Sequence, residues 1–157
     1  MELNPNWISG FVDGEGTFYI GIYKNEKTSV GYQVLPEFRV VQHAKNMKVL
    51  YALKKYFGCG VVRRNHGDRY EIRIRKLEHL EKIVLPFFEK YPLVTTKKFD
   101  FIKFREVMIC IKAGKHLSKD GIVDIIKIAS RMNRKKKTKA LEIMKKLQDK
   151  DIVHASM

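Results

Sequence analysis

Four short stretches of the chain have the hydrophobic pattern of β-strands: residues 17–23, 33–41, 60–64 and 69–75. Regular alternation of apolar and polar residues, clearest in 17–23 and 69–75, is typical of strands that bury one face. Polar loops at 24–31 and 65–68 join the strands in pairs. We therefore expect two hairpins and an antiparallel sheet, with an edge or a bulge where Pro36 interrupts the second strand.

Apolar residues recur at helical spacing in the segments that precede and follow these hairpins. Asn4 suits the N-cap and Pro5 the first turn of a short helix that we expect to end near Asp13, where glycines begin. Further helices are expected at residues 47–57, 77–91, 97–113 and, behind the N-cap Ser118, through Ala129. This order predicts an α+β protein of the mixed αββαββα type, with the helices packed on one face of the antiparallel sheet.

The length of 157 residues suits a single domain, with a core at about residues 4–113 and a basic helical tail at about 114–157. No long apolar run, signal-peptide pattern or lipidation motif is visible, which excludes the common membrane classes. We therefore expect a soluble, intracellular protein. Cys59 and Cys110 lack paired spacing, which argues against a disulfide framework or a zinc cluster.

The charge of the chain is strongly basic. Thirty-two Lys and Arg against 17 Asp and Glu leave a formal net charge of +15, which attracts polyanions. Nucleic acid is the expected partner, and an anionic membrane is the alternative. The basic run at residues 131–137 is consistent with a solvated linker or with a tract that contacts phosphates.

The most specific pattern lies at residues 7–16, which read Trp-Ile-Ser-Gly-Phe-Val-Asp-Gly-Glu-Gly. Gly10 and Gly14 are four residues apart, so one face of the first helix carries no side chains and a second backbone can approach it closely. Glu15 is expected just past the helix end, where free carbonyls and the helix dipole favour a cation. These oxygen donors suit Mg²⁺ or Ca²⁺. The alternative is an ordinary buried helix followed by an acidic turn residue.

Ile8 to Gly16 resembles the nine-residue motif that names the LAGLIDADG homing endonucleases, with mild departures such as Glu15 for the second Asp. Later segments resemble the family in the same order: Phe38-Arg39-Val40-Val41-Gln42, Gly58-Cys59-Gly60-Val61, Pro92-Leu93-Val94-Thr95-Thr96-Lys97, and the tail from His116-Leu117-Ser118 to Met132-Asn133. The resemblance covers nearly the whole chain and is to the single-motif, homodimeric type.

This resemblance implies a site-specific endonuclease that cleaves a long pseudo-palindromic site in double-stranded DNA by divalent-metal-dependent phosphodiester hydrolysis. It implies Mg²⁺ as the cofactor, held by Glu15 and the carbonyl of Gly14, with Ca²⁺ or Mn²⁺ able to support binding. Gln42 is expected to position the attacking water. A lysine is expected to face the developing charge, either Lys97 or Lys98, and the spacing favours Lys97.

The resemblance also implies pairing of two chains through their motif helices, because one motif supplies one acid and cutting both strands needs two sites. The expected dimer interface comprises Trp7, Gly10, Phe11, Asp13 and Gly14. In the family, the residue at the Asp13 position caps the partner helix, so we expect a structural role for it.

The outward face of the sheet is expected to form a saddle that enters the DNA major groove. Three arginines at the outward positions of strand 69–75 exceed what solubility requires, and they suit phosphates or guanine edges. The DNA-binding candidates on the strands are Tyr19, Gly21, Tyr23, Asn25, Gln33, Leu35, Glu37, Arg39, Arg63, Arg69, Glu71 and Arg73. The basic tract adds Arg134, Lys135, Lys136 and Lys137.

Two other functions stay open. An RNA maturase, which would bind structured intron RNA on the same scaffold, would not need Glu15. A DNA-binding regulator that has lost cleavage would bind its site without turnover. The intact Glu15 favours the nuclease over both.

Overall fold

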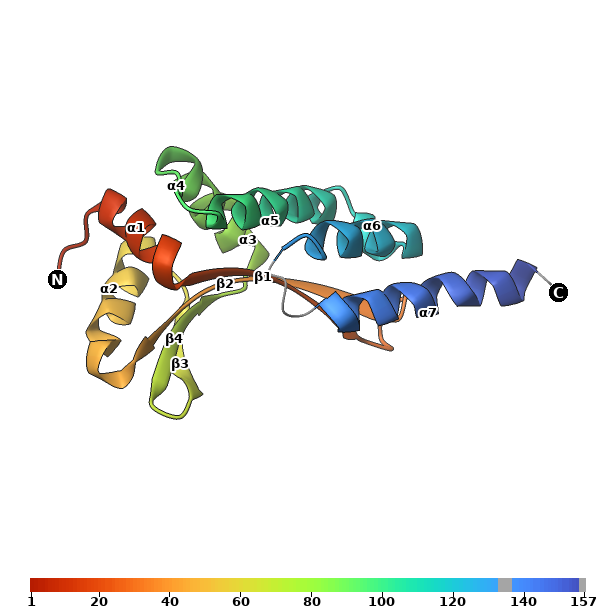
Figure 1. Ribbon diagram of the computed structural model, residues 1–157, viewed down its shortest axis with the longest axis horizontal. Coiled ribbons are helices and arrows are strands. Elements are labelled where there is room, and N and C mark those ends of the chain that lie inside the picture. Colours follow the sequence, from red (N-terminus) through yellow and green to blue (C-terminus); the bar gives the residue numbers. More distant parts are fainter. Residues whose placement is uncertain (133–136, 156–157) are drawn as a thin grey trace. The chain divides into compact units, whose positions relative to one another are not determined.

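The computed structural model describes residues 1–132 and 137–155, except for the side chains of 137–138 and 151–155 (Figure 1). The chain forms two compact units. The first comprises Met1–Tyr19 and Pro36–Phe101, and the second comprises Ile20–Leu35 and Ile102–Met157. The boundary therefore falls within two strands and one helix and not near residue 114. The single-domain organisation stays a prediction.

The sheet is four-stranded and antiparallel, in the order β1-β2-β4-β3. Its strands are β1 (Gly16–Lys24), β2 (Tyr32–His43), β3 (Val61–His66) and β4 (Arg69–Ile74). β4 lies between β2 and β3, pairing Phe38 with Ile74 on one side and Val61 with Arg73 on the other. The predicted α+β class and the two hairpins are confirmed. Pro36 precedes the segment of β2 that pairs with β4, so its missing N–H removes no hydrogen bond to that strand.

Helix α1 (Pro5–Glu15) runs directly into β1 (Figure 1). The Asn4 side chain caps it by accepting from the backbone N–H of Asn6 at 2.9 Å, as predicted. The helix continues two residues beyond the predicted end, so Glu15 is its last residue. At Gly16 a Cβ would lie 2.5 Å from Cγ1 of Val12 and 2.9 Å from the Val12 carbonyl oxygen, so only glycine lets the strand begin this close to the helix.

The helix predicted at 77–91 is not a regular α-helix. It consists of α3 (Leu77–His79), the π-helical segment η2 (Leu80–Val84) and α4 (Leu85–Lys90). Pro86 has no N–H to donate and its ring crowds the carbonyl one turn earlier, which explains why the helix widens before it. The expectation of one uniform helix was therefore wrong, although Pro86 in the sequence carried the signal.

Two further elements precede β3 in the first unit. The 3₁₀ turn η1 (Ala44–Asn46) leads into α2 (Met47–Phe57), which ends at Gly58 in the left-handed conformation, as predicted. The core joins sheet and helices through aromatic rings. Phe18 of β1 and Phe38 of β2 pack on Phe88 of α4, with ring centroids 5.4 and 5.6 Å away. The helices therefore cover one face of the sheet, and the charged residues of the strands lie on the other.

The second unit holds the distal hairpin of β1 and β2 together with the end of helix α5 (Lys97–Lys112) and the C-terminal helices. After the turn η3 (Lys115–Leu117), Ser118 caps α6 (Lys119–Ala129) by accepting from the N–H of Gly121 at 3.1 Å. α6 contacts α7 (Lys137–Ala155). None of the helices described has the length and apolar composition needed to cross a membrane.

Candidate functional site

The last turn of α1 carries an exposed carboxylate, that of Glu15, which forms no hydrogen bond or ion pair with the described residues. The ammonium group of Lys97, at the start of α5, donates a hydrogen bond to the carbonyl of Gly16, the next residue. Lys98 is exposed, and its ammonium lies 5.1 Å from the centroid of the Phe99 ring. Of the two candidate lysines, Lys97 is therefore the one that reaches the motif.

Half-burial of Lys97 changes its acidity. Burial lowers the pKa of the Lys97 ammonium below its ordinary value, and the nearby carboxylates of Asp13, Asp100 and Glu15 oppose this only in part. A lysine in this state loses its charge at a lower pH than a solvated lysine does. Lys97 therefore places a titratable cation near Glu15, the exposed carboxylate of the motif helix that forms no hydrogen bond or ion pair with the described residues.

Asp13 is bonded within its own chain. Its carboxylate accepts from the backbone N–H groups of Val94 and Thr95 at 2.9 and 3.0 Å and from the Thr95 hydroxyl at 2.7 Å. Burial raises the pKa of Asp13, but these hydrogen bonds and the charge of Lys97 outweigh it and leave the pKa below its ordinary value. Asp13 therefore holds the turn that leads into α5 and Lys97, and its expected contact with a partner helix stays a prediction.

Gln42 lies next to the end of β2, and its side-chain oxygen accepts from the amide of Asn46 at 3.4 Å. It makes no hydrogen bond to Glu15, so its role in positioning water stays a prediction. Within the part of the chain that the structure describes, no three His, Cys, Asp or Glu residues gather into a metal-binding group. Among the described residues, Glu15 is therefore an isolated exposed carboxylate at the end of α1 and not part of a cluster.

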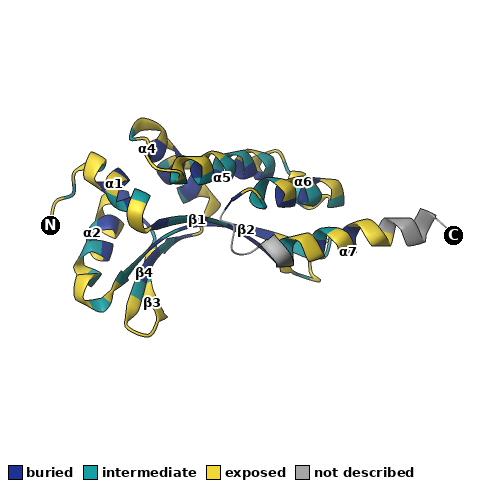
Figure 2. Cartoon of the chain, viewed as in Figure 1, coloured by how far each residue is buried: buried dark blue, intermediate teal, exposed yellow. Residues whose placement is uncertain are grey.

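One side of α1 is exposed and the other is buried (Figure 2). On the exposed side the rings of Trp7 and Phe11 stack with centroids 4.8 Å apart. A Cβ at Gly10 or Gly14 would meet nothing within 4 Å. The buried side includes Ser9, whose hydroxyl donates to the carbonyl of Tyr91 at 2.7 Å. Of the predicted interface residues on this side, Trp7, Gly10 and Gly14 are exposed and Phe11 is half-buried.

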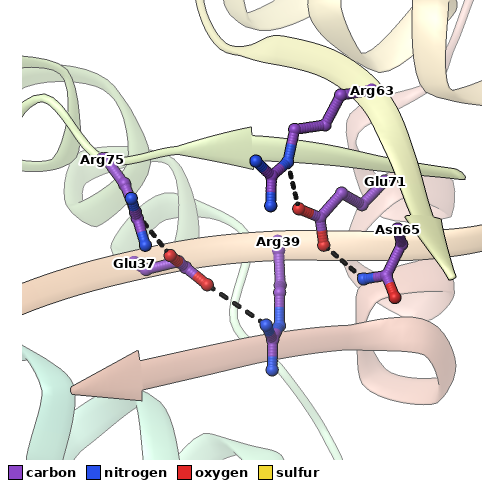
Figure 3. Close-up of polar contacts among 6 residues, drawn as sticks. All are labelled: Glu37, Arg39, Arg63, Asn65, Glu71 and Arg75. Carbon is purple, nitrogen blue, oxygen red and sulfur yellow. Dashed lines mark hydrogen bonds and ion pairs between the residues drawn. The ribbon is translucent and has the colours of Figure 1, made fainter. Parts of the chain in front are cut away.

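The outer face of the sheet in the first unit carries two buried carboxylates held by arginines. Glu37 is only 3% exposed. Its two oxygens accept from Arg39 Nη1 at 3.2 Å and from Arg75 Nε at 2.6 Å (Figure 3). The Arg39 guanidinium also lies 5.5 Å from the centroid of the Tyr19 ring.

Glu71 repeats this arrangement on β4. It is 1% exposed, and its oxygens accept from Arg63 Nε at 2.9 Å and from Asn65 Nδ2 at 2.5 Å (Figure 3). The sequence predicted Glu37 and Glu71 as outward groups open to a ligand, and this exposure was wrong. Long arginine side chains form ion pairs with both carboxylates, and the strand pattern alone does not reveal these pairs.

The other candidates on this face differ in their surroundings. Arg73 is half-exposed, and burial together with the charges of Arg75 and Arg63 lowers its pKa. Arg69 is exposed at the end of β4. The candidate list omitted Arg75 and Asn65. Arg75 was recognisable as the next outward position after Arg73, whereas Asn65 was assigned to a turn because β3 continues farther than predicted, to His66.

The remaining candidates lie in the second unit or outside the described residues. The ring of Tyr23 covers Gly21, which is buried, and Leu35 is half-exposed. The side-chain amide of Asn25 donates to Gln33 Oε1 at 3.0 Å. Arg134, Lys135 and Lys136 lie outside the described residues, as does the side chain of Lys137.

Comparison with known proteins assigns the motif to a family. A family model described as LAGLIDADG endonuclease matches residues 8–108 of the chain. The chain belongs to this family. The matched LAGLIDADG endonuclease region contains the motif helix from Ile8 onward, both hairpins and the start of α5 with Lys97.

Solved LAGLIDADG structures share the fold. The crystal structure of the homing endonuclease I-TnaI is 52% identical, with a TM-score of 0.90, and the match covers 94% of this chain and 99% of that one. A structure of I-SmaMI bound to uncleaved DNA target in the presence of calcium ions is 32% identical, with a TM-score of 0.87. That match covers 90% of this chain and 49% of the I-SmaMI chain.

Among curated sequences, a probable intron-encoded endonuclease 2 of Neurospora crassa is 31% identical over 133 residues, covering 83% of this chain and 29% of the relative. The chain thus spans only about a quarter to a third of the length of such intron-encoded relatives. The I-TnaI structure differs from these longer relatives, because the match covers 99% of its chain.

Proposed function

We propose that the protein is a site-specific endonuclease that binds double-stranded DNA and hydrolyses one phosphodiester bond in each strand. The observation that carries this proposal is the exposed carboxylate of Glu15 at the end of α1, one residue before the carbonyl that the Lys97 ammonium contacts. The Glu15 carboxylate forms no hydrogen bond or ion pair with the described residues, so it is available to bind a ligand. Similar solved structures of I-SmaMI bound to DNA support the choice of substrate.

The donor set fits a hard divalent cation. Glu15 and the carbonyl of Gly14 are oxygen donors at a helix C-terminus, where the helix dipole favours positive charge. Mg²⁺ is commonly held by one or two carboxylates, substrate phosphates and several waters, so the lack of a three-residue cluster among the described residues agrees with this ion. When bound, Mg²⁺ would polarise the scissile phosphate and lower the pKa of a coordinated water. Ca²⁺ or Mn²⁺ would support binding through the same oxygens.

The side chains of the protein itself supply positioning and charge. Lys97 is held at the end of the motif helix by its bond to Gly16, and Asp13 fixes the turn from which α5 starts. The Lys97 ammonium would stabilise negative charge that develops on the phosphate oxygens. Gln42 would orient the attacking water. No covalent intermediate with the protein is required, because water is the nucleophile.

Two chains are needed to cut both strands, since each supplies a single Glu15. The exposed side of α1 suits this pairing because the absence of side chains at Gly10 and Gly14 allows close backbone contact. The exposed ring of Trp7 and the half-buried ring of Phe11 would then be covered by the second copy. Two identical chains related by a twofold axis recognise a pseudo-palindromic site.

The test is incubation of the protein with a library of randomised DNA duplexes in Mg²⁺, followed by sequencing of the cut products. We expect a single long site with approximate twofold symmetry, cut in both strands. A Glu15→Gln variant should select the same duplexes in a binding assay but leave them uncut. Recovery of no enriched duplex, or equal cutting by the variant, would contradict the proposal. An RNA maturase would retain intron binding in that variant and select no DNA site.

A further inference from the structure

The outer face of the sheet contains more negative charge than a surface built only to attract DNA would need. Glu37 and Glu71 each place a carboxylate among arginines that would otherwise meet the phosphates unopposed. Carboxylates weaken the attraction for a polyanion, so their presence here requires another explanation. Burial of an ion pair is also weak evidence for stability, because desolvation offsets much of the attraction.

The bonds of the two carboxylates leave particular arginine donors free. Arg75 and Arg63 both bind their carboxylate through Nε, so their two Nη groups remain available as an end-on fork. That fork matches the O6 and N7 acceptors of a guanine. Arg39 binds through Nη1, which leaves Nε and Nη2 available. The side chains of the three arginines are 29–48% exposed, so they can reach a ligand. The buried carboxylates that they bind cannot.

Asn65 completes the second group. It uses Nδ2 to donate to Glu71, and it keeps its side-chain oxygen and a second N–H for a ligand. This pair of groups fits an adenine edge. Because Glu71 holds both Arg63 and Asn65, one buried carboxylate fixes two side chains with different base preferences (Figure 3).

We infer that Glu37 and Glu71 are positioning residues for base recognition, Glu37 fixing Arg39 and Arg75 and Glu71 fixing Arg63 and Asn65. This inference rests on the proposed function. A side chain already held in its binding conformation loses less conformational freedom when it binds, and a fixed fork also rejects bases that do not match it. The carboxylates thus favour discrimination between sites at the expense of general attraction.

The two groups should read different base pairs. Glu71 of β4 pairs with Val41 of β2, and Val41 lies four residues after Glu37 on the same strand. This separation is about 13 Å along the strand. It corresponds to about four base-pair steps of duplex DNA at roughly 3.4 Å each. Loss of either carboxylate should therefore affect its own positions in each half-site and leave those of the other intact.

The experiment uses the duplex that the wild-type protein selects from a randomised library and all its single-base variants, with binding measured without divalent ions. Glu37→Gln should reduce discrimination by about 10-fold at one or two base pairs per half-site, and Glu71→Gln should do so at a separate pair of positions. Binding to an unrelated duplex should be unchanged or tighter, because a negative charge is removed. Glu78→Gln is the control, since Glu78 bridges two basic residues, Lys76 and Lys82, but lies on α3 and not on the sheet.

Two further variants separate positioning from a general structural effect. Arg75→Lys, which keeps the charge but removes the fork, should relax the same base pairs as Glu37→Gln, and the double variant should lose nothing more there. If Glu37→Gln does not fold, then Arg39→Lys and Arg75→Lys must still relax neighbouring positions that differ from those relaxed by Arg63→Lys.

Uniform weakening at all positions, or an unchanged specificity profile in both carboxylate variants, would overturn the inference. Failure of the proposed function would look different. In that case the wild-type protein itself would select no duplex, and no specificity profile could be recorded.

Discussion

The acidic residues of the first unit occupy two contrasting environments. Glu15 is exposed and has no partner among the described residues, whereas Glu37 and Glu71 are buried and each accepts two hydrogen bonds. An unpartnered carboxylate in water keeps its lone pairs for a ligand. A buried and fully bonded carboxylate cannot take part in chemistry without breaking those bonds. The same residue type thus serves as a candidate reacting group at the helix end and as a fixed support on the sheet.

The largest effect is expected from Glu15→Gln, which removes the charge but keeps the shape. Cleavage should fall by about 10³-fold or more, because one uncharged amide replaces the proposed metal ligand. Affinity for the selected duplex should change by less than about threefold, since no base-reading residue is touched. Single-turnover cleavage in Mg²⁺ and a binding titration measure the two quantities. Equal loss in the exposed control Glu78→Gln would show that any carboxylate has this effect.

Lys97→Met should lower the cleavage rate by about 10²-fold, as expected for loss of one electrostatic stabiliser. Because the pKa of Lys97 is lowered, wild-type cleavage should fall as the pH rises through that lowered pKa, where the ammonium loses its proton. Arginine keeps its charge at high pH, so Lys97→Arg should move this fall to higher pH. A pH profile of single-turnover rates tests this, and identical alkaline limbs in both proteins would contradict the assignment.

The contrast also predicts effects of different size on stability. Glu71→Gln should lower the free energy of unfolding by about 1–3 kcal/mol, because it weakens bonds to a buried group. Glu15→Gln should change it by less than about 0.5 kcal/mol, as is usual for an exposed site. Urea unfolding of each variant measures both values. If Glu15→Gln were the more destabilising, Glu15 would have a structural partner, contrary to its exposure.

Gly10→Ala should have opposite effects on the single chain and on the dimer. A methyl group there meets nothing within 4 Å, and alanine favours helix more than glycine does, so the chain should gain roughly 0.5–1 kcal/mol. The same methyl group should obstruct close pairing of two α1 helices and raise the dimer dissociation constant. Sedimentation over a range of concentrations, together with thermal unfolding below the dissociation constant, separates the two effects. Tighter association in the variant would place the interface elsewhere.

The sequence was sufficient to predict which face of the sheet is charged. Side chains alternate with a period of two, so Ile72 and Ile74 had to point to the face of the sheet away from Arg73. The structure confirms this, because both isoleucines are buried. The sequence could not predict which charges pair. Glu37 and Arg75 are 38 residues apart, and their contact depends on the register between β2 and β4.

The site at the motif helix shows the same limit. The motif identified Glu15, but it did not predict that Glu15 lies inside the helix. The glycines at 14 and 16 suggested that the helix ends earlier. Lys97 and Lys98 are neighbours of equal charge, and only the packing of α5 on the motif decides which of them reaches Gly16. The contacts of Asp13 within its own chain could not be predicted, because Val94 and Thr95 are more than 80 residues away in sequence.

The central claim is that each chain contributes one exposed carboxylate, Glu15, and cuts one strand. Mixed dimers of the wild-type chain and a tagged Glu15→Gln chain, purified through both tags, test it most directly on the selected duplex in Mg²⁺. We predict that mixed dimers nick one strand of each duplex and leave the other intact, while wild-type dimers cut both. Double-strand cutting by mixed dimers at the wild-type rate would contradict the claim.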